Sequence, residues 1–339
     1  MTQASAAVAE PAQRDAVPLI ETRNLTRHFK VGGNFSRKRL HAVDDVNLVI
    51  NRREIVALVG ESGSGKSTIA RLLAQVYQPT SGEILYQGRP LSARRNRKDV
   101  LAYRSDVPMV FQDPFSSLNP AYRVSHGIMR GLKLHRPELT KEQQQAEAER
   151  VVTAVGMTPA GDILDRYPHE LSGGQRQRIG FAQALAYRPT LILADEPVSM
   201  LDVSIRIGLL NVMAKLREEE NVSILYITHD LASARYLSDR LLVMYGGHIV
   251  ESGPTESVLA DPKHPYTQLL LSAVPDPRAP LVVGAETDKG EPPRVIDPTE
   301  GCRFRWRCPY AIDECHQVTP LLRVLGPAHS AACHVAKPD

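Results

Sequence analysis

The chain has 339 residues, which is enough for two domains of about 100–200 residues each. Hydrophobic residues make up 42% of it and charged residues 23%, a balance that is ordinary for folded globular chains and excludes wholesale disorder. The 41 lysines and arginines exceed the 38 aspartates and glutamates by only 3, whereas a nucleic-acid-binding chain is expected to carry a strong basic excess.

Neither a membrane span nor a secretion signal is visible in the sequence. No stretch reaches the roughly 18 consecutive apolar residues that a membrane-spanning helix needs. Residues 1–18 lack a basic segment followed by a continuous apolar one, which a secretory signal requires. We therefore expect a cytosolic protein that would act at a membrane only by docking onto other chains.

The first half of the chain contains a strand–loop–helix pattern. Residues 1–17 are rich in Ala, Gln and Pro without periodicity, and we expect a disordered arm there. Residues 19–29 alternate as a strand does. Residues 54–60 form a short apolar run rich in β-branched side chains, typical of a buried strand. A Gly/Ser loop and a helical pattern from Thr68 onward follow directly.

The second half alternates further strands with helices. Residues 113–185 are rich in helix-favouring residues and predict an inserted helical subdomain. Buried strands are expected at 189–195 and 222–228, each ending in polar residues. This alternation predicts an α/β fold with a mixed, mostly parallel sheet and ligands at the carboxyl ends of its strands. A proline-rich linker then leads from residue 261 into a tail containing cysteines.

The loop after the first buried strand carries the phosphate-binding pattern G-x-x-x-x-G-K-[ST], as GESGSGKS at residues 60–67. In such a loop, glycines let backbone N–H groups surround phosphates, the lysine neutralises their charge and the last hydroxyl ligates Mg²⁺. A chance Gly/Ser loop is the alternative, but the strand before it and the helix after it favour the functional interpretation. The predicted ATP-binding residues here are Gly60, Ser62, Gly63, Ser64, Gly65, Lys66, Ser67 and Thr68.

Two adjacent carboxylates, Asp195 and Glu196, follow the strand predicted at 189–195. The first can hold Mg²⁺ and the second can polarise an attacking water. Acidic residues often begin loops, so this pair gains its meaning only together with the phosphate-binding loop.

A second candidate phosphate nest is the segment Leu171, Ser172, Gly173, Gly174 and Gln175. The segment is either a helix-capping turn or a loop whose N–H groups bind phosphate. One ATP cannot use both nests of one chain. We therefore expect a dimer in which this segment contacts ATP held by the partner.

Taken together, these motifs resemble the nucleotide-binding subunit of an ATP-binding-cassette (ABC) transporter, over about residues 19–255. Residues 171–175 match its signature segment, and residues 199–202, although Met200 replaces the usual small residue, match the loop after the two acids. The resemblance implies a P-loop cassette in which Glu196 and His229 are catalytic and Ser67, Gln112 and Asp195 hold Mg²⁺. It also implies that Phe29 stacks on adenine and that Asp202 lies at the dimer contact.

A narrower resemblance covers nearly the whole chain. Residues 166–178, 264–270 and the tail around 301–310 are similar to the oligopeptide/dipeptide importer ATPases, and other segments lean towards the second, F-type subunit. This implies domains at 18–260 (nucleotide-binding) and 261–339 (linker and extension). It also implies a place at the cytoplasmic face of the cell membrane, with a second ATPase subunit (a paralogue, or an identical chain), two permease subunits and an external substrate-binding protein. Relatives that import oligosaccharides, opines or nickel leave the substrate open.

All four cysteines, Cys302, Cys308, Cys315 and Cys333, lie in the tail, spaced C-x₅-C-x₆-C-x₁₇-C. Such a cluster in a cytosolic protein predicts a metal site before it predicts disulfides. The resemblance favours a [4Fe–4S] cluster, with zinc as the second choice and free thiols or opportunistic disulfides as the alternative to both. We expect Phe304 and Trp306 to shield it. Because it lies outside every ATP motif, we expect a structural or docking role.

Two other function classes fit the sequence less well. A soluble cassette ATPase acting on DNA would need a long coiled-coil insertion, and none with sustained heptads lies between the two phosphate nests. Cassettes that act on ribosomes occur in pairs within one chain, and here there is one. A third class, an exporter subunit, would often be fused to membrane helices, and the sequence shows no such span.

Overall fold

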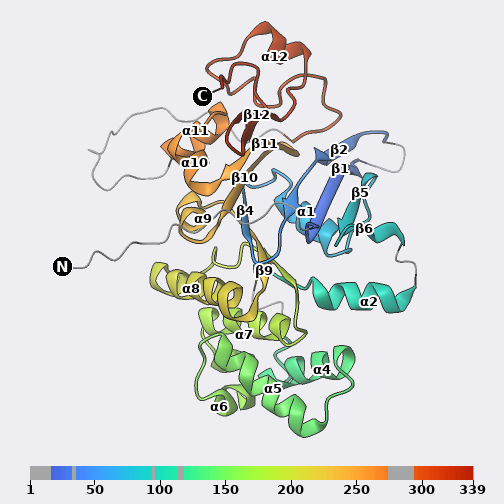
Figure 1. Cartoon of the computed structure of the whole chain (residues 1–339), viewed down its shortest axis with the longest axis vertical. Coiled ribbons are helices and arrows are strands. Elements are labelled where there is room, and N and C mark those ends of the chain that lie inside the picture. The colour runs from blue at the N-terminus through green and yellow to red at the C-terminus, as the bar shows by residue number, and fades with distance from the viewer. Residues whose placement is uncertain (1–16, 33–35, 94–95, 114–117, 274–293, 339) are drawn as a thin grey trace, which may run out of the picture.

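The computed structural model describes residues 17–32, 36–93, 96–113, 118–273 and 294–338. Two sheets lie in the middle of an elongated molecule, with a group of helices at one end and the C-terminal residues at the other (Figure 1). Most of the predicted arm (residues 1–16) and of the predicted linker (residues 274–293) lies outside the described residues.

Among the described residues, the larger sheet has eight strands, and its half from β10 to β7 is parallel. The remaining pairs are antiparallel. This confirms the predicted mixed, mostly parallel sheet. In spatial order the strands are β12 (Arg323–Gly326), β13 (His329–Ala331), β11 (His248–Pro254), β10 (Arg240–Tyr245), β4 (Ile55–Val59), β9 (Ser223–Thr228), β8 (Leu191–Asp195) and β7 (Met109–Val110).

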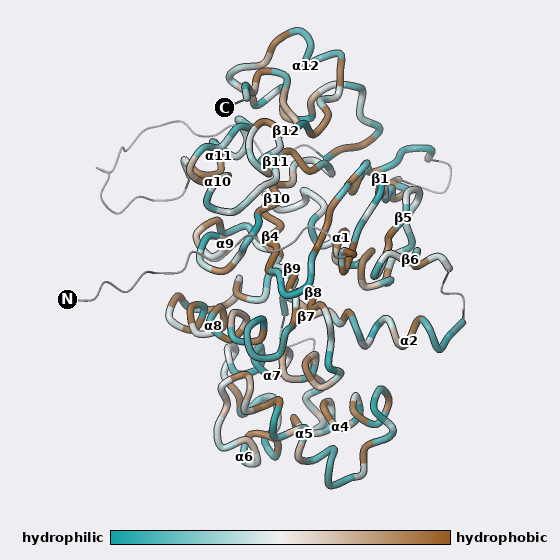
Figure 2. Tube along the Cα trace, viewed as in Figure 1, coloured by the Kyte–Doolittle hydropathy of each residue, from teal (hydrophilic) through white to brown (hydrophobic). Residues whose placement is uncertain are grey.

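The central strands are apolar on both faces because both faces are covered. In β4, Ile55, Ala57 and Val59 enter one core, whereas the alternate residues Val56 and Leu58 enter the other. Since successive side chains of a strand point to opposite faces, a strand between two cores must be apolar throughout. The continuous hydrophobic colour of this part of the chain is visible in Figure 2.

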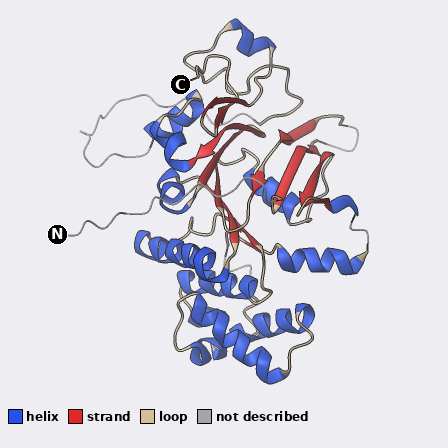
Figure 3. Cartoon of the chain, viewed as in Figure 1, coloured by secondary structure: helices blue, strands red, loops and turns tan. Residues whose placement is uncertain are grey.

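The smaller sheet is antiparallel and covers one edge of the molecule (Figure 3). The sequence predicted only its first strand. Its strands are β2 (Arg39–Val46), β1 (Ile20–Lys30), β5 (Ser81–Tyr86) and β6 (Arg89–Pro90), with β3 (Val49–Ile50) paired to β1.

The helices flank the larger sheet on both faces, and the predicted helical insertion forms the lower lobe in Figure 1. Two of its helices, α5 and α7, begin with a capping box in which a hydroxyl and a glutamine satisfy each other's backbone N–H groups. The described helices are α1 (Lys66–Leu73), α2 (Arg97–Asp106), α4 (Val124–His135), α5 (Lys141–Ala154), α6 (Ala160–Asp165), α7 (Gly173–Leu185), α8 (Val203–Glu220), α9 (Leu231–Leu237), α10 (Thr255–Ala260), α11 (Pro265–Ser272) and α12 (Asp313–Gln317), with short 3₁₀ turns at Leu91–Ala93 and Pro168–Glu170.

The C-terminal extension, residues 261–339, continues the larger sheet. Strand β13 pairs with β11, and β12 adds the edge. Phe304 is buried, with its ring centroid 5.2 Å from that of Tyr245 and 5.5 Å from that of Tyr266. The expectation that Trp306 shields the cysteines is wrong, because its side chain is 74% exposed. Sequence pattern missed these contacts because single aromatic residues, not a periodic stripe, make them.

Of the helices in the described parts of the chain, none combines the length and apolar character that crossing a membrane demands.

The buried His264 makes the stability of the fold depend on pH. It caps α11, with its ring Nδ1 accepting a hydrogen bond from the Tyr266 backbone N–H at 3.0 Å, while the backbone N–H of His264 donates to Glu251 Oε2 at 3.0 Å. Burial lowers the pKa of His264 to about 3. Below about pH 6.5, His264 is protonated in the unfolded chain but stays neutral in the folded chain. Its contribution to the unfolding free energy is therefore fully present above that pH and is lost as the pH falls.

We expect the protonation of His264 in the unfolded chain to lower the free energy of unfolding by roughly 2 kcal/mol when the pH falls from 7 to 5. His264→Asn retains a capping acceptor without the titration, so its urea-unfolding free energies at the two pH values should differ less by about that amount. The same substitution at the exposed His126 is the control. An identical pH dependence in wild type and His264→Asn would contradict the assignment.

Candidate functional site

The parallel half of the larger sheet brings the sequence motifs together. Because these strands run in one direction, their carboxyl ends share one edge of the sheet. The P-loop (residues 60–67) follows β4, and Asp195 ends β8 with Glu196 directly after it. His229 follows β9, and Gln112 comes just after β7. The motifs, far apart in sequence, therefore form one row.

The backbone of the P-loop requires two of its glycines. Gly60 has φ +157°, and a Cβ there would lie 2.2 Å from the Met244 carbonyl oxygen. Gly65, the residue before α1, has φ +111°, and a Cβ there would lie 2.1 Å from the Ala42 carbonyl oxygen. Both contacts are with backbone, which cannot yield, so any side chain would push the loop away from its strand. The glycines thus set the loop directly over the end of β4 and the start of α1.

The lysine and the serine of the P-loop are held in place by oxygen atoms. Lys66 Nζ donates to the carbonyl oxygens of Gly60 (2.7 Å) and Glu61 (2.9 Å). Burial lowers the pKa of Lys66, and the carboxylates of Glu196, Asp195 and Glu61 oppose that change. Ser67 Oγ donates to Asp195 Oδ1 at 2.8 Å. Burial raises the pKa of Asp195, against the hydrogen bond from Ser67.

Glu196 lies between two polar side chains from neighbouring strand ends. Gln112 Nε2 donates to its Oε2 at 3.2 Å and to Ser199 Oγ at 3.3 Å. His229 Nδ1 lies 3.3 Å from the same Oε2. The backbone of Glu196 is left-handed, with φ +47°, and its N–H donates to the Ile227 carbonyl at 3.0 Å. This turn directs the carboxylate of Glu196 towards Gln112 and His229.

These residues line one cleft of about 1110 Å³, which we call the nucleotide cleft. Two of the predicted ATP-binding residues, Ser64 and Asp195, are buried and do not line this cleft. Phe29 lies on its edge, packed against Tyr77 with 5.3 Å between ring centroids and with the Arg27 guanidinium 4.6 Å above its ring. The predicted residues that line the cleft are Phe29, Gly60, Ser62, Gly63, Gly65, Lys66, Ser67, Thr68, Gln112, Glu196 and His229.

The signature segment (residues 171–175) lines a different cavity. Ser172 Oγ accepts a hydrogen bond from the Gln175 N–H, and the Gln175 amide oxygen accepts one from the Ser172 N–H, so α7 begins at this segment. Ser172, Gly174 and Gln175 lie on a cavity of about 470 Å³ beside α8. Leu171 is buried. Asp202 is exposed directly before α8, and Met200 beside it is 62% exposed.

Sequence reasoning missed the contribution of the C-terminal extension to the nucleotide cleft. Tyr266 Oη accepts a hydrogen bond from the Glu61 N–H at 2.8 Å. Arg307 donates to both carboxylate oxygens of Glu61, at 2.7 and 2.9 Å. Residues 294–296 also line the cleft. The motifs around 264 and 307 were visible in the sequence, but nothing in them indicated that they reach the P-loop.

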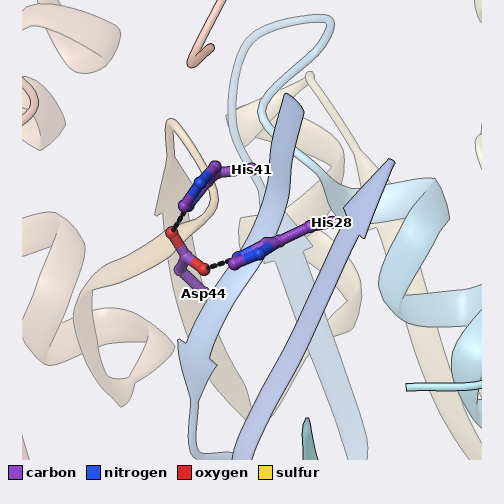
Figure 4. A group of neighbouring side chains, drawn as sticks. All are labelled: His28, His41 and Asp44. Atoms are coloured by element: carbon purple, nitrogen blue, oxygen red, sulfur yellow. Dashed lines mark hydrogen bonds and ion pairs between the residues drawn. The ribbon is translucent and has the colours of Figure 1, made fainter. Parts of the chain in front are cut away.

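Asp44, on β2, lies between the imidazole rings of His28 and His41 (Figure 4). His28 and His41 bond its two oxygens, the latter at 2.7 Å, and Arg303 of the extension also donates to it. Burial would raise the pKa of Asp44, but the hydrogen bonds from His28, Arg303 and His41 outweigh it and lower the pKa to about 2. In the described chain, His28, His41 and Asp44 form the one group of three potential ligands within 4.8 Å of one another. Because Arg303 already neutralises the carboxylate, we assign this group to the ion-pair network.

The four cysteines are thiols, of which Cys315 and Cys333 are buried, and they do not form a tight group. Within the described residues, no three of the cysteine sulfurs lie within 4.8 Å of one another. The N–H of Cys302 donates to the carbonyl of Cys315 at 2.8 Å. Burial raises the pKa of Cys302 to about 11, the Phe304 N–H opposes this, and the charges of Cys315, Cys333 and Cys308 add to it. The other three thiols therefore lie near enough to Cys302 to influence its charge.

Comparison with known proteins identifies the domains. Residues 43–199 match the family model described as ABC transporter, and residues 250–315 match the model for the oligopeptide/dipeptide transporter, C-terminal region. Solved structures similar to the chain include a dimeric, post-hydrolysis state of the ATP-binding cassette MJ0796 bound to ADP and phosphate (27% identity, TM-score 0.61, 70% of this chain and 98% of that one). CbiO1 of Clostridium perfringens, part of an ABC transporter complex, is also similar (25% identity, TM-score 0.63, 72% and 91%).

Relatives resemble the chain over nearly its whole length. The oligopeptide transport ATP-binding protein AppF of Bacillus subtilis (strain 168) is 42% identical over 322 residues, which is 94% of this chain and 97% of AppF. YkfD of the same organism, also named for oligopeptide transport, is 41% identical over 94% of this chain and 96% of its own. The resemblance drawn from the motifs is thereby confirmed, and the chain belongs to the ABC-transporter ATPases whose cassette is followed by the oligopeptide/dipeptide transporter C-terminal region.

Proposed function

We propose that this chain is the ATP-hydrolysing subunit of an importer of oligopeptides or dipeptides, working through separate membrane subunits. The observation that carries the proposal is the row of P-loop, Asp195, Glu196, Gln112 and His229 around one cleft. The peptide substrate rests on the relatives' names and on the C-terminal region that the chain shares with that family. Other segments, the two glycines that follow Phe29 and the stretch from Ser272, lean towards the F-type subunit.

Residues of this chain supply each part of phosphoryl transfer. The P-loop N–H groups and Lys66 bind the phosphates, and Phe29 stacks on the base. Ser67, Asp195 and Gln112 would hold Mg²⁺, for which their oxygen atoms are suitable donors; when bound, the ion neutralises phosphate charge. Glu196 takes the proton of the attacking water at Oε2, and His229, on the same oxygen, orients that carboxylate and the γ-phosphate.

The signature segment acts on ATP held by the partner subunit. Supporting this, Ser172 and its neighbours line a cavity separate from the nucleotide cleft, so the chain holds two phosphate nests that do not share one site. The similar cassette MJ0796 was solved as a dimer. In our proposal the partner is a paralogue or an identical chain, Asp202 lies at the contact, and dimer closure completes both sites.

Docking to two permease subunits places the chain at the cytoplasmic face of the cell membrane, with an external substrate-binding protein delivering cargo. Phe111, next to Gln112, is 46% exposed, and Tyr122 is 49% exposed. Exposed aromatic residues beside a catalytic loop suit a protein contact. Import of an oligosaccharide, an opine or nickel by a member of the same subfamily remains the second candidate, which co-purification with the permeases and a transport assay would separate.

The cysteines Cys302, Cys308, Cys315 and Cys333 would hold one metal centre. Zinc bound to four thiolates at about 2.3 Å would bring all its sulfurs to roughly 3.8 Å from one another, whereas no three cysteine sulfurs of the described residues lie within 4.8 Å of one another. A [4Fe–4S] cluster spreads its ligands over a larger cage, so we prefer the cluster over zinc. Such a centre would stabilise a segment that has a small core of its own.

Glu196→Gln should reduce ATP turnover at least about 100-fold, because it removes the general base but keeps its shape. ATP binding should persist, as measured with a fluorescent nucleotide, while phosphate release stops. Lys66→Ala should fail earlier, at nucleotide binding. The control is Glu219→Gln, an exposed position on α8. Near wild-type turnover in Glu196→Gln would remove Glu196 from this role.

Two inactive chains should complement each other if the signature segment acts in trans. Ser172→Arg and Lys66→Ala are each expected to be inactive alone, yet their mixed dimer contains one intact P-loop facing one intact signature. We expect the mixture to regain ATPase activity when the chain pairs with itself; with a paralogous partner, the substitutions are divided between the two chains. Full activity in a strictly monomeric preparation contradicts the arrangement.

Anaerobically purified protein should contain iron and sulfide in equal amounts, with broad visible absorption, and Cys308→Ser should lose them. Elemental analysis and the absorption spectrum make the measurement. Zinc alone would support the second choice. A folded protein with neither metal and with four titratable thiols would refute the centre altogether.

A further inference from the structure

Glu61, the second residue of the P-loop, is tied to the C-terminal extension at two of its groups. Its N–H donates to Tyr266 Oη at 2.8 Å, and its carboxylate receives both terminal nitrogens of Arg307 at 2.7 and 2.9 Å. Its carbonyl oxygen accepts from Lys66 Nζ at 2.9 Å. The residue that holds the phosphate-binding lysine is therefore itself held by residues of the extension.

The ion pair is built into the surrounding structure. The Arg307 side chain is 12% exposed and that of Glu61 25%. The guanidinium lies 5.7 Å from the ring centroid of Tyr245 and 5.8 Å from that of Phe304. Two parallel N–H···O bonds in a confined setting fix both position and orientation, which exposed surface pairs do not do.

The negative charge of Glu61 lies close to the proposed phosphate-binding site. Glu61 lines the nucleotide cleft together with Lys66. Without a partner, this carboxylate would repel a triphosphate and compete for Lys66. The ion pair with Arg307 offsets that charge.

A second arginine, four residues earlier, supports the neighbouring turn. Arg303 donates to the Gly246 carbonyl and to Asp44, and the adjacent Gly247 N–H donates to the Ser64 carbonyl of the P-loop at 2.9 Å. The loop between Cys302 and Cys308 thus reaches the P-loop by two routes.

We propose that Arg307 is a positioning residue for ATP, which fixes Glu61 and neutralises its charge, so that the C-terminal extension sets the nucleotide affinity of the cassette. The proposal rests on the proposed function only in taking the cleft as the ATP site.

The full-length Arg307→Gln variant should bind ATP about tenfold more weakly, equivalent to about 1.4 kcal/mol, with KM raised to match and kcat within about twofold of wild type. Adding Glu61→Gln should recover most of the affinity, because the uncompensated charge is then gone. Arg307→Lys keeps the positive charge but not the two parallel hydrogen bonds, so its ATP affinity should lie between those of wild type and Arg307→Gln. Calorimetric ATP titration and steady-state phosphate release measure these quantities.

The matched control is Arg305→Gln. Arg305 lies in the same loop, but its guanidinium donates to the Cys302 carbonyl oxygen and the Thr299 hydroxyl within the extension, so the variant should bind ATP as wild type does. Far-UV circular dichroism verifies folding, and if Arg307→Gln does not fold, Arg307→Lys and the double variant carry the test. Unchanged ATP affinity in folded Arg307→Gln, or no recovery in the double variant, overturns the proposal alone. Absence of ATP binding by wild type would overturn both it and the proposed function.

Discussion

Parallel pairing of buried strands is the constraint on which the whole site depends. Strands β10, β4, β9, β8 and β7 run in one direction, so each delivers its following loop to the same edge of the sheet. The strands tolerate this only because helices and the smaller sheet bury both faces, as the alternation of β4 between two cores shows. Without that double cover, the five loops would have no common edge at which to form a cleft.

Close backbone packing converts this arrangement into a defined site. The P-loop lies against carbonyl oxygens of Met244 and Ala42 at distances that leave no room for a Cβ. The Ser67–Asp195 hydrogen bond and the contacts of Gln112 and His229 with one oxygen of Glu196 then relate the motifs to one another. The side chains that we propose for catalysis are thus placed by strand ends and by close backbone contacts.

The extension is coupled to that site rather than appended to it. It adds β12 and β13 to the main sheet, inserts Phe304 between aromatic residues of β10 and α11, and places Arg307 on Glu61. Although the extension is far from the P-loop in sequence, it thereby shares both a hydrophobic core and an ion pair with the cassette. Arg303 and Arg307 lie in the loop between Cys302 and Cys308, so whatever orders these two cysteines also positions the arginines.

Sequence alone determined the elements whose signals are local. The strand at 54–60, the P-loop, the adjacent acids at 195–196 and the helix-opening glycines at 173–174 are each readable within about ten residues, because glycine conformation, strand burial and capping are short-range effects. Tertiary structure alone decided which distant residues meet. The exposure of Trp306, the burial of Phe304 and the pairing of Arg307 with Glu61, 246 positions apart, depend on how the extension folds back over β10 and β11. No local pattern encodes such a contact, because an arginine beside a cysteine has the same local preferences whether it faces solvent or a carboxylate.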